Sequence, residues 1–138
     1  MPASPEPTPE QNKRLLHRWL DELWNQGRRQ TITELFSKTG ILHSGNRHSR
    51  GPAEFLHYYD IMHSVFSQFS IKPVVTLAEG DLVCVHWAVD CVHTVSRTPV
   101  HTTGITVARV KDGQFIEGWQ NWDAIGITQQ IPGLVLPY

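Results

Sequence analysis

The stretch "DGQFIEGWQNWDAIGITQQIPG", residues 112–133, decides the fold because it joins a turn, a strand and the start of a helix. Residues 115–122 hold a phenylalanine, an isoleucine and two tryptophans, which favour β-structure. Asp123 precedes "AIGITQQ", where its side chain fits the N-cap of a short helix. The stretch therefore predicts a final strand that leads directly into a capped terminal helix.

Three more strands are predicted upstream, over residues 74–77, 82–94 and 100–110, from runs rich in Val, Ile and Thr. The tripeptides "EGD" and "KDG" are typical of hairpin turns. Gly113 fits the left-handed position of a type I turn followed by a bulge. That register predicts three cross-strand pairs: Val110 with Gln114, Thr106 with Gly118, and Thr102 with Trp122.

Helical spacing of apolar residues dominates the chain before residue 70. A first helix begins after Thr8, which forms a capping box with Gln11, and ends at Gly27. A short second helix closes at Gly40 and leads into a strand over residues 41–44. The third helix opens with "GP" and carries the apolar residues Phe55, Tyr58, Tyr59, Met62, Val65, Phe66 and Phe69.

Three helices followed by a β-meander predict an α+β domain, in which N-terminal helices wrap a cone-shaped, curved antiparallel sheet. We expect one domain over residues 9–138, because 138 residues is a usual domain size, and a flexible Pro-rich tail over residues 1–8.

Composition restricts the partners and the location of the protein. The net charge is −1 and no long Lys or Arg run occurs, so we expect no nucleic acid partner. No apolar run approaches the roughly 18 residues that a membrane span needs, and we expect no membrane partner. Cys84 and Cys91 lie on opposite faces of one predicted strand, and we interpret them as unpaired buried thiols of a cytoplasmic protein.

Several stretches, taken together, resemble the SnoaL-like polyketide cyclases. These are "ELWNQG", "ILHS", "RGPAEF", "EGDLVCVHW" and "ARVKDGQFIEGWQNWDAIGITQQIPG", and the resemblance covers residues 10–133. The cyclases belong to the nuclear-transport-factor-2-like superfamily, with ketosteroid isomerase and limonene epoxide hydrolase. The resemblance implies the cone fold and a pocket between the helices and the sheet.

The resemblance also identifies two positions that carry acid/base residues in the cyclases. There an aspartate lies on the last strand and a histidine on the preceding one, equally far from the hairpin glycine. Those positions here are Gln120 and Thr106, and neither side chain exchanges a proton near neutrality. Asp123 falls on the other face of the strand, so we interpret it as the helix cap.

Two histidines are the candidate catalytic residues that remain. His43 matches the position of the general base in ketosteroid isomerase, and the resemblance places His86, with Ala88, on the inner face of its strand. At His86 and Ala88 the epoxide hydrolases carry an Arg-x-Asp pair, which is absent here. The predicted substrate-binding residues are Trp24, Phe55, Tyr58, Met62, Thr106, Gln120 and Trp122. No His-Glu-x-x-His or Cys-x-x-Cys spacing occurs, so we expect no metal and no other cofactor.

Two functions are consistent with these residues. The first is a cofactor-free isomerase, cyclase or lyase that acts on a hydrophobic carbonyl compound, with the two histidines as acid and base. The second is a non-catalytic module that binds an apolar small molecule in the same pocket. The histidines favour the first function, and the missing aspartate favours the second.

Apolar residues on the opposite face of the strands predict an interface. We expect a homodimer through the convex face of the sheet, because a monomer rarely exposes so much contiguous apolar surface. The residues assigned to this interface are Val83, Val85, Trp87, Val89, Ile105, Val107, Phe115 and Trp119.

Overall fold

A computed structural model describes residues 7–136, so most of the tail predicted over residues 1–8 lies outside the described residues. The elements, in chain order, are α1 (Pro9–Leu20), η1 (Asp21–Asn25, a π-helical turn), α2 (Gln30–Leu35), β1 (Phe36–Ser44), β2 (Arg47–Arg50), α3 (Gly51–Val65), β3 (Phe66–Glu79), β4 (Leu82–His93), β5 (Pro99–Lys111), β6 (Gln114–Trp122) and α4 (Ala124–Gln130).

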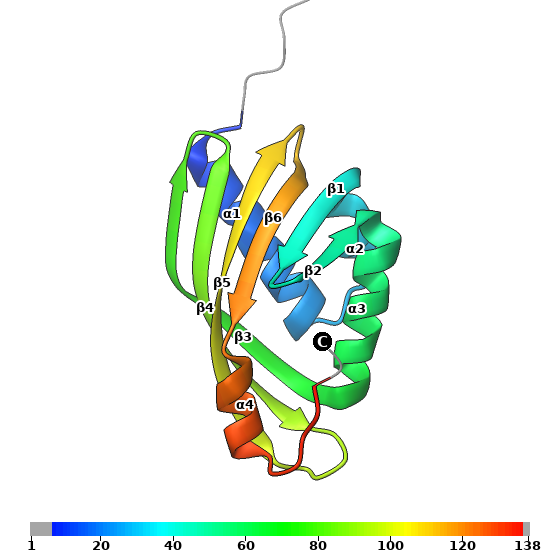
Figure 1. The fold of residues 1–138 in the computed structure, drawn as a ribbon. Helices are drawn as coiled ribbons and strands as arrows, with labels where there is room; N and C mark the ends of the chain where they lie inside the picture. The colour runs from blue at the N-terminus through cyan, green and yellow to red at the C-terminus, as the bar shows by residue number, and fades with distance from the viewer. Residues whose placement is uncertain (1–6, 137–138) are drawn as a thin grey trace, which may run out of the picture.

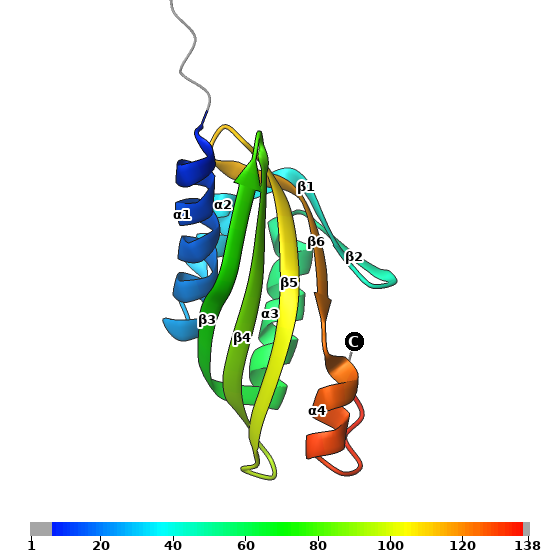
Figure 2. The ribbon, with the colours of Figure 1, turned by 90° about the vertical axis from the view of Figure 1, so that its left-hand side faces the viewer.

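The strands form one curved six-stranded sheet in the order β2-β1-β6-β5-β4-β3. Neighbouring strands are antiparallel except β1 and β6, which are parallel. The helices α1 and α3 pack against the concave side, and α4 extends from the end of β6 (Figures 1 and 2). This arrangement confirms the predicted α+β cone and adds one parallel pair to the expected antiparallel sheet.

The boundaries differ from the prediction where apolar residues fit both periodicities. The second helix ends at Leu35, and Phe36 already begins β1, whereas the prediction extended the helix to Gly40. The third helix ends at Val65, so Phe66 and its neighbours belong to the long strand β3 instead. Both phenylalanines are still buried, at 5% and 1% exposure for Phe36 and Phe66. Burial was therefore predicted correctly where the secondary structure was not.

The β5–β6 hairpin has a tighter turn than predicted. Asp112 and Gly113 both adopt positive φ angles, 52° and 73°, as a two-residue type I′ turn requires. Lys111 consequently pairs with Gln114, and a β-bulge or similar irregularity between Arg109 and Val110 shifts the register by one more residue, so Thr106 pairs with Gln120 instead of Gly118. The register is shifted by two residues at Thr106, so the same side chains still share a face.

The orientation of β4 is the reverse of the prediction. Val85 pairs with Thr106 on the inner face, and Val85 is fully buried whereas its neighbour His86 is partly exposed on the outer face. The inner set, which was assigned to a convex interface, is part of the core: Val83, Val85, Trp87, Val89 and, from β6, Phe115. Alternation of apolar residues by itself favours this orientation, and the resemblance to the family favoured the opposite one.

Both predicted helix caps are present. The Thr8 hydroxyl accepts a hydrogen bond from the Gln11 amide, and the Gln11 side chain accepts from the Thr8 amide, which completes the capping box. The Asp123 carboxylate accepts from the Gly126 amide at 2.8 Å. Asp123 therefore caps α4, as the sequence predicts.

Cys84 and Cys91 are both free thiols, and only Cys91 is fully buried. Burial raises the pKa of the Cys91 thiol to about 11. In residues 7–136 no helix has the length and apolar composition needed to cross a membrane.

Candidate functional site

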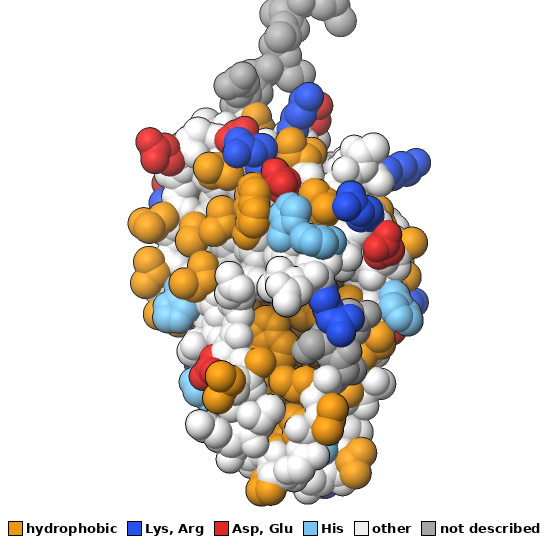
Figure 3. Space-filling view, in the orientation of Figure 1, with side chains coloured by type: hydrophobic (Ala, Val, Ile, Leu, Met, Phe, Trp, Pro, Cys, Tyr) orange, Lys and Arg blue, Asp and Glu red, His pale blue; other side chains and the backbone are white. Residues whose placement is uncertain are grey.

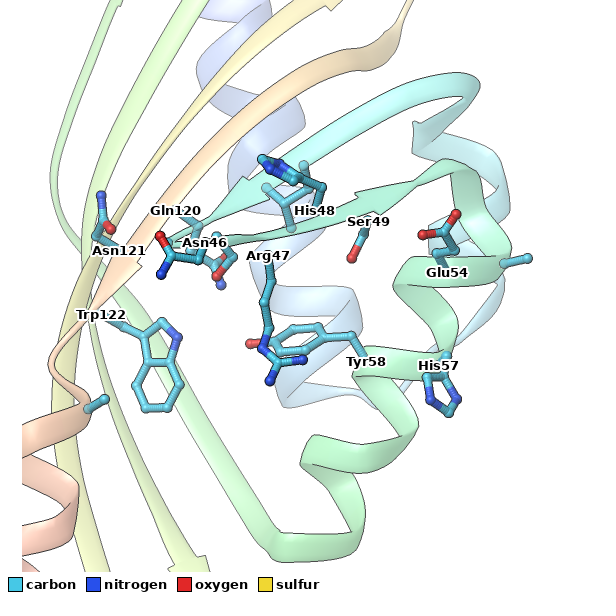
Figure 4. A pocket seen from close by; sticks show the side chains of 15 residues that line it. Asn46, Arg47, His48, Ser49, Glu54, His57, Tyr58, Gln120, Asn121 and Trp122 are labelled. Atoms are coloured by element: carbon cyan, nitrogen blue, oxygen red, sulfur yellow. The ribbon is translucent and has the colours of Figure 1, made fainter. Parts of the chain in front are cut away.

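The β1–β2 hairpin forms one wall of the candidate site. Ser44 pairs with Arg47 across a two-residue turn in which Gly45 has a φ of 60°. Leu42 lies on the inner face of the sheet and pairs with Ser49, so alternation places Arg47 on that inner side too. In Figure 4 the Arg47 side chain points from β2 into the cavity, toward Tyr58.

The helix α3 forms the opposite wall. It begins at Gly51, whose φ of 73° lets the chain turn sharply out of β2, and Pro52 occupies the first turn. The helix presents Glu54 and His57 at one end of the cavity and the buried ring of Tyr58 deeper in it (Figure 4).

The C-terminal end of β6 forms the third wall of the cavity. Gln120, Asn121 and Trp122 line the cavity immediately before Asp123 caps α4. Because Asp123 caps α4, β6 ends at Trp122, and its last three residues lie at the cavity.

The main cavity has a volume of about 570 Å³, and Figure 3 shows a hollow floored by hydrophobic side chains on this side of the molecule. Two smaller cavities of about 60 and 30 Å³ lie deeper in the cone. Tyr58 and Trp122 border both the main cavity and the 60 Å³ cavity, and Gln120 borders all three. Gln120 is therefore the side chain at which the hollow spaces of the cone meet.

The structure places five of the seven predicted substrate-binding residues along these cavities. Tyr58, Gln120 and Trp122 line the main cavity, Trp24 lines the 60 Å³ cavity, and Thr106 lines the 30 Å³ cavity. The Thr106 hydroxyl also accepts a hydrogen bond from the Trp87 indole at 3.0 Å. The other two, Phe55 and Met62, are buried in the core and line none of the three.

Neither predicted catalytic histidine lines a cavity. His43 pairs with Trp119 and His86 pairs with Ile105, so both histidines lie on the outer face of the sheet. His43 contacts Glu117, with 2.8 Å between Nε2 and Oε2, and its Nδ1 lies 2.9 Å from Nδ1 of His48. The prediction that these histidines face Tyr58 and Gln120 is therefore wrong. Successive side chains of a strand point to opposite faces of the sheet, so each histidine points away from the cavity that its sequence neighbours face.

One histidine is enclosed by aromatic rings elsewhere in the fold. His63 stacks on Trp24 and contacts Tyr59 and Phe69, with ring centroids 5.5, 4.2 and 4.8 Å away. Its Nε2 atom is buried without a hydrogen-bond partner in the described structure. Burial lowers the pKa of His63, because the charged imidazolium loses hydration there.

Sequence reasoning missed eight polar residues of the main cavity: Arg47, Ser49, Glu54, His57, Ser44, Asn46, His48 and Asn121. A local signal for the first two exists, because "GN" between "ILHS" and "RHSR" is a hairpin dipeptide. Within residues 7–136, no group of three or more His, Cys, Asp or Glu side chains is arranged to hold a metal ion.

Solved structures share this architecture across almost the whole chain. A protein from Jannaschia sp. CCS1, named as a SnoaL-like polyketide cyclase, is 19% identical with a TM-score of 0.84, over 97% of this chain and 100% of that one. IdmH from Streptomyces antibioticus, named as a polyketide cyclase, is 21% identical with a TM-score of 0.76, over 88% and 98%. An LEH-like epoxide hydrolase from M. tuberculosis is 18% identical with a TM-score of 0.71, over 92% and 96%.

The curved sheet, the covering helices and the cavity between them define the nuclear-transport-factor-2-like class of α+β cones. Residues 14–131 match the family model of the SnoaL-like polyketide cyclases, and the chain belongs to that family. No curated protein sequence matches the chain.

Proposed function

We propose that the protein binds a hydrophobic carbonyl compound in the main cavity and promotes its enolisation, as in a cyclase or isomerase reaction. A volume of about 570 Å³ suits a small organic molecule. The observation that carries the proposal is the position of the Gln120 side chain. It borders all three cavities, and its side-chain amide makes no hydrogen bond to another described residue, so that amide is available to a ligand.

The chemistry follows from the side chains on the cavity. The amide of Gln120 can donate hydrogen bonds to a carbonyl oxygen, and the Tyr58 hydroxyl and the Arg47 guanidinium face the same space. Donors directed at one oxygen stabilise the negative charge that develops on it as an enolate forms. Gln120 cannot accept the proton from carbon, so in this proposal Glu54 or His57 of α3 accepts it.

A direct test measures enolisation itself. Aromatic ketones that raise the melting temperature would be incubated in D₂O, and hydrogen–deuterium exchange at the carbon beside the carbonyl would be followed by NMR. We expect the protein to accelerate this exchange. Gln120→Leu should weaken ligand binding by about three- to tenfold, the worth of one hydrogen bond. His86→Leu on the outer face is the matched control and should change neither property.

The alternative function is binding without catalysis, and one specific observation favours it. Both histidines predicted to transfer protons lie outside the cavity. Ligands that bind with no acceleration of the exchange, in the wild type and in variants of Glu54 and His57 alike, would establish the binding function in place of the enzymatic one.

We also propose a homodimer through the outer face of the sheet, in which Ile105 and Trp119 of the predicted interface are joined by residues of β3 that were not predicted. Val75 and Leu77 on β3 are 50% and 65% exposed, and Ile105 on β5 is 48% exposed. These strands flank β4, whose His86 lies between Val75 and Ile105, and Trp119 on β6 continues the same face. Contiguous apolar surface of this kind favours association with a second copy. Leu77→Lys should therefore shift the mass measured by light scattering from dimer to monomer. A monomeric wild-type protein would contradict the proposal.

A further inference from the structure

The outer face of the β1–β2 hairpin carries a pair of histidines, of which His48 also borders the main cavity and His43 does not. His43 and His48 are directly opposite each other in the antiparallel pairing. Their Nδ1 atoms are 2.9 Å apart, and the rings are nearly perpendicular, at 86°. His43 also stacks on Trp119 at 5.7 Å, which holds its ring against the sheet. We propose that His43 and His48 form a two-histidine chelate for Cu²⁺ or Ni²⁺.

Glu117 prepares His43 to be a ligand. The Glu117 carboxylate lies 2.8 Å from Nε2 of His43 and accepts a hydrogen bond from the N–H group of the tautomer protonated there. The Nδ1 atom of a neutral His43 is then left with a lone pair directed toward His48. Histidines that bind metals usually donate their second nitrogen to a carboxylate in this way, which fixes the tautomer and the ring orientation.

The separation of the two nitrogens indicates the coordination geometry. With metal–nitrogen bonds of about 2.1 Å, the observed 2.9 Å between the Nδ1 atoms subtends an angle of roughly 90° at the metal. A tetrahedral site would need the nitrogens roughly 3.4 Å apart, given the same bond length. Adjacent positions at a right angle belong to square-planar and octahedral sites, which favour Cu²⁺ and Ni²⁺ over Zn²⁺.

Binding requires a small change at His48. Its Nδ1 must offer a lone pair, so a proton on Nδ1 moves through solvent to Nε2, and a neutral ring stays neutral. His48 is exposed, which lets its ring turn toward a metal and leaves the remaining coordination positions to water. The chelate would join β1 to β2 at the hairpin whose inner side lines the main cavity.

Calorimetric titration of the full chain with NiCl₂, CuSO₄ and ZnCl₂ tests the proposal. We expect one Cu²⁺ or Ni²⁺ per chain, weaker Zn²⁺ binding, and a higher melting temperature with Ni²⁺. His43→Ala and His48→Ala should each lower the affinity at least about tenfold, and Glu117→Gln about tenfold, as removal of such a carboxylate typically does. His86→Ala is the matched control, because His86 lies on the same outer face but on β4, opposite Val75 and Ile105 instead of opposite the pair. It should leave the affinity unchanged.

The Cu²⁺ form gives a second measurement. Its electron paramagnetic resonance spectrum should show two coordinated imidazole nitrogens in the wild type and fewer in His48→Ala. Far-UV circular dichroism without metal checks that each variant folds. Equal binding by the wild type and His48→Ala would overturn the proposal, and so would one metal for every two chains.

Discussion

Along β4, Trp87 and His86 are neighbours in sequence but lie on opposite faces of the sheet, and the two faces differ in chemistry. The inner face buries Val85 and Trp87 and leads to a cavity where an amide, Gln120, is the central polar group. The outer face carries histidines, exposed apolar side chains and Glu117. The titratable groups expected to work inside the cone are therefore on the surface that a partner or an ion would meet.

The largest expected effect separates these two neighbours. Trp87 is 7% exposed and donates its indole N–H to Thr106, so Trp87→Ala should cost about 3–5 kcal/mol of unfolding free energy. His86→Ala, one residue away on the outer face, should change it by less than about 0.5 kcal/mol. Urea denaturation followed by circular dichroism measures both. Similar losses for the two variants would contradict the assignment of faces.

A smaller loss of stability is expected from a substitution at Gly104, where the inner face of the sheet has no space for a side chain. A methyl group at Gly104 would overlap the Trp87 ring and approach the Asn121 carbonyl oxygen to 2.8 Å. Gly104→Ala should therefore cost about 1–3 kcal/mol, the usual range for overpacking. The same substitution combined with Trp87→Phe should cost less, since the smaller ring frees space. An unchanged cost in that background would show that the backbone contact dominates.

The junction after β6 should respond more weakly still. Asp123→Ala removes the cap of α4 and should cost about 0.5–2 kcal/mol. Asp123→Asn should be nearly neutral, because asparagine caps as well as aspartate. Thermal denaturation distinguishes the two variants. If Asp123→Asn abolished enolisation without a change in melting temperature, Asp123 would be a catalytic acid instead of a cap.

The smallest effect concerns a histidine that is enclosed, unlike those on the outer face. The pKa of His63 is lowered in the folded protein, so protonation favours the unfolded state. Its contribution to stability should be complete above the unfolded pKa of about 6.5 and should decline as the pH falls below that value. Melting curves from pH 7.5 to 5 should show this decline in the wild type and a smaller one in His63→Phe. Parallel curves would rule out His63 as its source.

The sequence predicted the fold more reliably than the site. The strands β4 to β6, the cap at Asp123 and the capping box at Thr8 follow from local signals, which depend on a few adjacent residues. Gln120 also lines the cavity, because a register error of two residues leaves its side chain on the same face of the sheet. The fold, moreover, was supported by the order of many stretches along the chain.

The orientation of β4 depends on information that no short stretch contains. The pairing of β4 with β5 and the packing of the helices determine which face of β4 points inward, and therefore where His86 lies. Both are properties of the assembled sheet. His43 was placed by analogy with the general base of ketosteroid isomerase, and even the solved SnoaL-like structures that share this fold are only 19% and 21% identical to this chain. At that distance the fold is retained, but the role of a single position need not be.

The parallel pairing of β1 with β6 has a consequence for how the protein folds. It joins residues 36–44 to residues 115–120, so the contacts that close the cavity span most of the chain. Contacts between segments so far apart in sequence form slowly, because a large loop must be closed before they yield any free energy. On the ribosome, the first three helices emerge without the strand that completes the cone. We therefore expect the nascent chain to expose apolar surface until β6 arrives, which makes chaperone binding during synthesis more probable than for a protein built from local contacts.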